Sequence, residues 1–218
     1  MSELPDKAKE LKDLARTQRA SGHHGEAAKT LEKAIALLEG STHTADPVLQ
    51  PGAAEQLADL YGMLGGTLRE QGDLIGSARA YDKGFRYESD PRYGIHSSYN
   101  AVNRLTTRIL LYPHSWAEPA SLQAQPALEF VNVPVELTKL RDRLEGQIAG
   151  ARSDDYWAAG DLAIVSALLG DDDAAAKAAA RLASSSPPPN AYKTYLNLVK
   201  ALADLDTPRE QSLQRLKS

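Results

Sequence analysis

The sequence predicts an all-α protein in which antiparallel helix pairs stack side by side as a solenoid. Hydrophobic residues make up 42% of the 218 residues but aromatics only 6%, and alanine and leucine supply most of the apolar content. Small apolar side chains suit closely packed helices better than β-sheets, which favour β-branched and aromatic residues. A spacing of small and large residues also recurs after glycine-centred turns, as in tetratricopeptide (TPR) units of ~34 residues.

The first helix pair is predicted for residues 6–39. Its first helix has apolar core positions at Leu11, Leu14 and Ala15. Gly22 opens the turn, and the second helix places its core residues at Ala27, Leu31 and Ala34. This spacing after the glycine is the informative part of the pattern.

The second pair repeats the pattern more strongly. Its first helix is marked by Tyr61, Leu64, Gly65 and Leu68, and the helix after the turn by Ser77, Tyr81 and Gly84. Gly72 and Asp73 form the turn between them. Gly72 lies where the end of a helix requires a positive φ, which glycine adopts at low cost.

The remainder of the chain predicts two more pairs and a cap. The third pair is degenerate, with helices at about 97–111 and 135–149, and the fourth covers 156–187 with its turn at Gly170 and Asp171. A capping helix is expected at 190–205, followed by a short tail at 209–216. Longer loops are expected at about 40–56 and 112–134, and segment 128–133 could be briefly extended. Residues 1–218 are therefore predicted to form a single TPR-like domain.

Charge and composition exclude several classes of function. The net charge of −4 argues against a general affinity for nucleic-acid polymers, which requires a basic surface. The absence of cysteine excludes disulfides and thiolate metal sites. No run is apolar enough for a secretory signal or a membrane span, so we expect a cytoplasmic protein without a membrane partner.

Motifs for catalysis are absent from the sequence. The five histidines form no HxxxH or HExxH pair, and neither a GxxxxGK[ST] loop nor a GxSxG elbow is present. The acidic run at 171–173 suits the start of a helix, and the residues after it do not complete an EF-hand. We therefore expect no enzyme, no catalytic residues, no metal and no cofactor.

The first helices of successive pairs should line a concave groove with polar and aromatic side chains. The candidate ligand-binding residues are Arg16, Arg19, Arg69, Tyr99, Asn100, Asn103, Arg104, Arg108 and Trp157. Guanidinium groups bind carboxylates or phosphates bidentately, and asparagine amides donate to the same oxygens. Trp157 or Tyr99 could stack on a base.

Each of these residues has a simpler interpretation. An exposed arginine on a helix is usually solvated, and Trp157 suits a hydrophobic core as well as a ligand stack. Gly62 and Gly66 either leave space for a ligand to approach the backbone or mark a crossing of helices, because an interior glycine costs ~1 kcal/mol against alanine. Tyr81 is expected to be a core residue.

Several segments between residues 57 and 182 resemble a known family. They are Tyr61-Gly-Met-Leu-Gly-Gly66, Arg69-Glu-Gln-Gly-Asp-Leu74, Ala80-Tyr-Asp-Lys-Gly84, Ser98-Tyr-Asn-Ala-Val-Asn-Arg104, Asp155-Tyr-Trp-Ala158 and Leu168-Leu-Gly-Asp171. Together they resemble the tetratricopeptide-repeat sensor domains of bacterial conflict systems, which are similar to the central helical region of stress-activated MAP kinase kinase kinases. The resemblance implies sensing of a nucleotide-like signal that is passed to an effector. One departure is Ile164, where the family pattern has a polar or acidic residue seven positions after the tryptophan.

Three hypotheses for function follow. The first is a sensor that binds a nucleotide-like small anion in the groove and signals to an effector protein. The second is a protein–protein interaction adaptor that grips an acidic peptide or the C-terminus of a partner. The third is a homo-oligomer formed through the alanine-rich run at 174–183.

Overall fold

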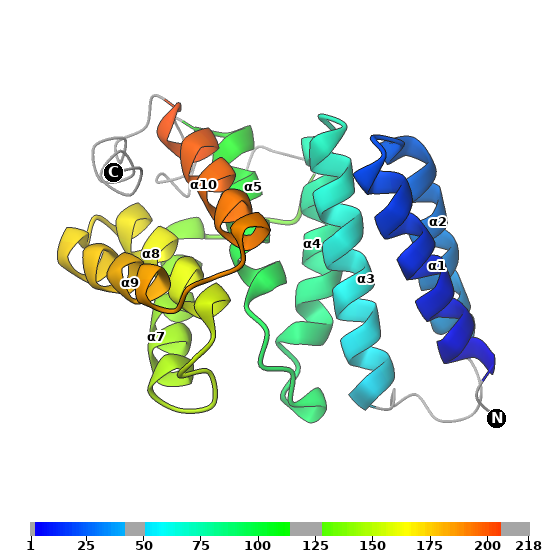
Figure 1. Cartoon of the computed structure of the whole chain (residues 1–218), viewed down its shortest axis with the longest axis horizontal. Coiled ribbons are helices and arrows are strands. Elements are labelled where there is room, and N and C mark those ends of the chain that lie inside the picture. The colour runs from blue at the N-terminus through cyan, green and yellow to red at the C-terminus, as the bar shows by residue number, and fades with distance from the viewer. Residues whose placement is uncertain (1–2, 42–50, 114–127, 206–218) are drawn as a thin grey trace. The chain divides into compact units, whose positions relative to one another are not determined.

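The computed structural model describes residues 3–41, 51–113 and 128–205 of the chain. All regular secondary structure in these ranges is helical, which confirms the all-α prediction (Figure 1). Adjacent helices pack as pairs, whereas a TPR-type solenoid stays a prediction. Most of the two predicted long loops and the predicted tail at 209–216 lie outside the described residues. None of the described helices is long and apolar enough to cross a membrane.

The chain divides into two compact units, residues 1–104 and 105–218, and each is described by itself. The prediction that 1–218 form one continuous domain stays a prediction. Unit 1 contains α1 (Glu3–Ala20), α2 (His24–Ser41), α3 (Pro51–Glu70), α4 (Leu74–Glu88), the 3₁₀ helix η1 (Pro91–Tyr93) and the first part of α5 (Tyr99–Leu111). Unit 2 contains the rest of α5, α7 (Val133–Ala149), α8 (Tyr156–Leu169), α9 (Asp172–Ser184) and α10 (Pro189–Ala203).

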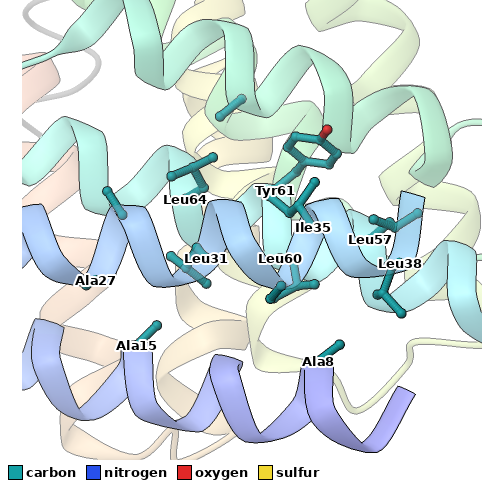
Figure 2. Packing of buried hydrophobic residues seen from close by; sticks show 13 residues of the cluster. Ala8, Ala15, Ala27, Leu31, Ile35, Leu38, Leu57, Leu60, Tyr61 and Leu64 are labelled. Carbon is teal, nitrogen blue, oxygen red and sulfur yellow. The ribbon is translucent and has the colours of Figure 1, made fainter. Parts of the chain in front are cut away.

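The core of unit 1 is a layer of apolar side chains between consecutive helices. In the sequence order α1, α2, α3, α4, each helix packs against the next. Alanines on α1 allow that helix to approach α2 closely, and larger side chains fill the space between α2 and α3 (Figure 2). The labelled members of this cluster are Ala8, Ala15, Ala27, Leu31, Ile35, Leu38, Leu57, Leu60, Tyr61 and Leu64.

Unit 2 is organised around α8, which packs against α7, α9 and α10. Most of α8 is apolar and buried, so it forms the centre of this unit rather than an amphipathic cover. Gly160 lets α10 approach, because a Cβ there would lie 3.2 Å from the ring of Tyr195. A helix is present where the capping helix was predicted, as α10, and its role as the cap of a solenoid stays a prediction.

Three helix pairs share the same turn. Gly22, Gly72 and Gly170 have φ values of 79°, 83° and 79°. In each turn the glycine N–H donates to the carbonyl three residues earlier, and the next N–H donates to the carbonyl five residues earlier. This is the Schellman arrangement that satisfies the last carbonyls of a helix. The positive φ predicted for Gly72 is confirmed.

Two element boundaries differ from the prediction. The loop expected at about 40–56 is partly helical, because α2 continues to Ser41 and α3 begins at Pro51. Proline is favoured in the first turn of a helix, and the burial of Ala54 and Leu57 holds the new turn against the core. The helix expected from residue 135 begins at Val133, where the Asn132 side chain accepts from the N–H of Val135. Segment 128–132 contains no strand.

Glycines let α3 and α4 pack closely and leave space for side chains of α5 within unit 1. A Cβ at Gly65 would lie 2.8 Å from the Tyr81 ring, and one at Gly62 would lie 2.9 Å from the Tyr99 ring. A Cβ at Gly84 would meet the Asn100 side chain. Tyrosine rings and an amide thus fill the space beside these glycines. At Gly65 the structure shows the crossing of α3 with α4, at Gly62 the Tyr99 ring fills the space, and at Gly66 the ends of the Arg19 and Tyr99 side chains lie nearest.

We expect Gly65→Ala to lower the free energy of unfolding by about 1–3 kcal/mol, because the added methyl overpacks against the fully buried Tyr81. Gly40→Ala in α2 is the matched control, since nothing lies within 4 Å of a Cβ there. Its stability should be unchanged or slightly raised, because alanine favours helix. Urea unfolding followed by circular dichroism measures both, and equal stabilities of the two variants would contradict the crossing.

Candidate functional site

Four of the sequence-predicted site residues lie close together near Gly66 of α3, within unit 1. Arg19 comes from α1, Arg69 from α3, and Tyr99 and Asn103 from α5. A Cβ built on Gly66 would lie 3.2 Å from Nη2 of Arg19 and 3.5 Å from the hydroxyl of Tyr99. Nη1 of Arg69 donates to Oδ1 of Asn103 at 2.9 Å. These four residues and Tyr81 are called the arginine–tyrosine cluster below.

The start of α5 is fixed by side chains that the sequence analysis did not identify. The carboxylate of Glu88, at the end of α4, is 2% exposed and accepts from the N–H groups of Asn100 and Ala101 at 2.9 and 3.2 Å. The Ser97 hydroxyl accepts from the N–H of Tyr99. A negative charge is favourable at a helix N-terminus, where N–H groups lack partners within the helix. Tyr99 and Asn103 are therefore held in register over α3.

Arg19 is held by an ion pair that links α1 to α3. Its Nε and Nη2 donate to the two carboxylate oxygens of Glu70 at 2.7 and 2.6 Å, and Nδ1 of His24 lies 3.2 Å from the same carboxylate. Burial by itself would raise the pKa of Glu70, but the hydrogen bond and charge of Arg19 outweigh it and hold that pKa below its ordinary value. The hydrogen bond to Glu70 raises the pKa of Arg19.

Arg69 has a different environment. No carboxylate lies within ion-pair distance of its guanidinium in the described part of the chain, and Asn103 is its one hydrogen-bond partner there. Asn103 is itself oriented by donating from Nδ2 to the carbonyl oxygen of Tyr99 at 2.8 Å. Arg69 is thus a partly buried cation that is positioned by neutral groups and keeps donors available.

The hydroxyl of Tyr81 is the unusual member of the cluster. Tyr81 is fully buried, and among the described residues its hydroxyl makes no hydrogen bond of good geometry; its hydrogen-bonding contact with Tyr99 is a weak one. Burial raises its pKa well above the ordinary value, and the charge and hydrogen-bonding contact of Tyr99 raise it further, while the charges of Arg69 and Arg19 oppose the rise. The rings of Tyr81 and Tyr99 meet edge to face with centroids 6.1 Å apart. The sequence predicted Tyr81 as core but contained no signal for the weak pairing of its hydroxyl.

A pocket of about 250 Å³ lies beside Tyr99. Its wall combines residues of α3, the loop after η1 and the start of α5: Glu55, Ala58, Asp59, Ile95, Ser97, Tyr99 and Asn100. Asp59 pairs with Lys12 of α1. Glu55 is exposed and has no hydrogen-bond or ion-pair partner within the described residues. The pocket therefore offers a carboxylate acceptor next to an aromatic face.

Three other predicted site residues of unit 1 have structural partners. Arg16 is exposed and pairs with Asp13 of its own helix at 2.7 Å. Asn100 is buried and donates to the carbonyl of Ala58. Arg104 lies with its Nε 3.3 Å from Asp82 and its guanidinium carbon 4.1 Å from the Phe85 ring centroid, so it links α5 to α4.

The remaining two predicted site residues, Arg108 and Trp157, belong to unit 2. Arg108 is 3% exposed and donates to the carbonyl of Glu129 at 3.3 Å. Trp157 stands at the start of α8, where Asp155 accepts from its backbone N–H, and its indole is 40% exposed. Its ring is tilted against Tyr156 with centroids 5.3 Å apart. Of the two interpretations of Trp157, the structure excludes burial in the core.

No three histidine, aspartate or glutamate side chains in the described residues are placed to hold a metal ion. In the comparisons with known proteins, no family model matches the sequence, and no curated protein is similar enough to count as a relative.

We expect Glu70→Gln to lower the free energy of unfolding at neutral pH by about 0.5–1 kcal/mol, the size typical of a partly exposed pair. Because the folded-state pKa of Glu70 lies below its ordinary value of 4.5, its contribution is full above that value and is lost as the pH falls through the folded-state pKa. The difference between wild type and variant should therefore disappear in acid. Urea titrations across this range measure it, with the exposed Glu32→Gln as control. A difference that persists or grows on acidification would contradict the pairing.

Proposed function

We propose that this chain is a non-catalytic sensor whose unit 1 binds a nucleotide-like anion at the arginine–tyrosine cluster and passes the binding event to an effector protein. The observation that carries the proposal is Arg69, a partly buried cation that is held by the Asn103 amide, with no carboxylate within ion-pair distance among the described residues. A cation that is positioned by neutral groups keeps its charge and its free N–H donors for an anionic ligand.

Arg69 supplies the charge that the anion requires. Arg19 is largely neutralised by Glu70, whereas Arg69 has the Asn103 amide in place of a carboxylate. A guanidinium that is already oriented loses little side-chain entropy on binding and can donate two parallel hydrogen bonds to a phosphate or carboxylate. The Tyr99 hydroxyl lies close enough to Gly66 to donate to the same group.

The pocket beside Tyr99 would receive the remainder of the ligand. Tyr99 is 37% exposed, so its ring is available for stacking on a base. The Glu55 carboxylate would accept from amino groups of that base. Asp59 and Arg69 are ten residues apart on α3, or about 15 Å along the helix. A ligand with a planar donor group at one end and an anionic group at the other would lie along this face.

The three recurring glycine turns support a TPR-type interpretation of this face. The residues five, nine and twelve positions after Gly22 and Gly72 are buried in both pairs. In an arrangement of this kind α1, α3 and α5 are first helices of successive pairs, and those helices supply the members of the cluster that reach the surface. The chain would then use its repeated architecture to collect binding groups from separate pairs.

Calorimetry against a panel of nucleotides tests the proposal. Arg69→Ala should weaken binding of the nucleotide that binds wild type by about tenfold or more, because a charge-assisted hydrogen bond contributes ~1.5–3 kcal/mol. Lys29→Ala removes the same charge from an exposed site on α2 and should leave affinity unchanged. If no nucleotide binds, or if both variants bind equally well, the proposed site is wrong.

Tyr81→Phe separates binding from stability. Without ligand, the variant should be as stable as wild type or more stable by about 1 kcal/mol, because the buried hydroxyl that it removes makes no hydrogen bond of good geometry. With ligand, it should show the same increase in melting temperature as wild type, because this hydroxyl has no exposed surface for a ligand to contact. Thermal denaturation with and without nucleotide measures both effects. A variant that loses stability without ligand would indicate that the hydroxyl is already satisfied in the free protein.

A further inference from the structure

Unit 1 has a second pocket, of about 320 Å³, which shares no lining residue with the pocket beside Tyr99. Its walls come from the end of α2, the middle of α3, the last turns of α4 and η1. Tyrosines and cations dominate the lining. None of these residues belongs to the arginine–tyrosine cluster or takes part in the proposed function.

Three tyrosine rings form a continuous aromatic surface on this pocket. The rings of Tyr61 and Tyr87 are nearly parallel, with an interplanar angle of 15° and centroids 6.2 Å apart. Tyr93 of η1 continues the surface, with its centroid 6.4 Å from that of Tyr87. Burial raises the pKa of both Tyr61 and Tyr87, and Glu39 raises both further, so their hydroxyls stay neutral at physiological pH. The surface therefore presents no phenolate that would repel an anion.

The carboxylates of the pocket are engaged by the protein itself. Glu39 accepts from the Tyr61 hydroxyl at 2.6 Å. Asp90 accepts from the backbone N–H, Nε and Nη2 of Arg92, and it caps the start of η1. Neither carboxylate has the open geometry that would attract a cationic ligand.

Lys83 is the polar group that remains available. Its ammonium lies 5.4 Å from the Tyr61 ring centroid, and in the described parts of the chain it has no hydrogen bond and no ion pair. An ammonium offers three donors and no acceptor, so it selects an anionic or acceptor group. A cation over a tyrosine face keeps that position while it binds an anion on its outer side.

The same geometry disfavours a cationic ligand. Aromatic surfaces bind quaternary ammonium groups through their ring faces. Here Lys83 covers the face of Tyr61, and Arg92 lies 5.5 Å from the centroid of Tyr93. Two of the three ring faces already have a cation of the protein, so an added positive charge would meet repulsion.

We infer that this pocket is a second ligand site, specific for a small molecule that joins an aromatic ring to a single carboxylate or phosphate. The ring would lie on Tyr87, the one of these three rings that no cation of the described residues covers, and the anionic group would accept from Lys83. A volume of about 320 Å³ is at the small end of the range for ligand pockets, which suits a compound of this size. This inference is independent of the nucleotide proposal.

Benzoate, phenyl phosphate, inorganic phosphate and benzylamine are the probes, titrated into the full chain and followed by NMR shifts of the tyrosine ring protons. Benzoate or phenyl phosphate should bind, and the tighter of the two identifies the anionic group. Lys83→Ala should weaken that binding by about tenfold, and Lys83→Arg should restore part of it. Arg69→Ala and Lys29→Ala should leave it unchanged.

Three outcomes would overturn the inference. Benzylamine binding as well as benzoate would show that charge does not select the ligand. Inorganic phosphate binding as well as phenyl phosphate would show that the aromatic surface contributes nothing. Equal affinity of Lys83→Ala and wild type would place the bound probe elsewhere. Since Lys83 is exposed, its replacement leaves the fold intact, and circular dichroism verifies this.

Discussion

The packing of α4 on α3, and of the Tyr99 and Asn100 side chains of α5 against them, depends on the absence of side chains at Gly62, Gly65 and Gly84. Each interior glycine weakens its helix by about 1 kcal/mol against alanine. In exchange, the ring of Tyr81 is buried against Gly65, and Asn100 fits against Gly84. Any larger residue at these positions would push the helices apart. The groups proposed to bind a ligand would then lose their common location.

The same packing stabilises unit 1 but leaves polar groups of the arginine–tyrosine cluster with few hydrogen-bond partners. It buries the Tyr81 ring, which stabilises the fold, but it leaves the hydroxyl of that ring without a hydrogen bond of good geometry. It also brings Arg69 to Asn103, a neutral partner, although carboxylates are abundant in this acidic chain.

Sequence reasoning succeeded where structure is determined locally. A glycine that ends a helix leaves a signal in a few neighbouring residues, so the turns at Gly22, Gly72 and Gly170 could be placed in advance. Arg19, Arg69, Tyr99 and Asn103 lie close together, and their role in binding a ligand stays a prediction. The partners of the cations could not be predicted, because Glu70 and Asp82 reach their arginines through tertiary packing. The pocket lined by Tyr61, Tyr87 and Tyr93 could not be predicted, because its residues come from four elements that only the tertiary fold brings together.

The buried carboxylate of Glu88 determines where α5 begins, because it binds two N–H groups of the first turn directly. The backbone that connects α4 to α5 therefore does not by itself determine the position of α5. Residues such as Pro91, Gly94 and His96 are exposed in this connection. Insertions or deletions there would change the two pockets that this connection lines while the register of α5 stays constant. The position of α5 would then stay the same while the length and sequence of the connection before it change.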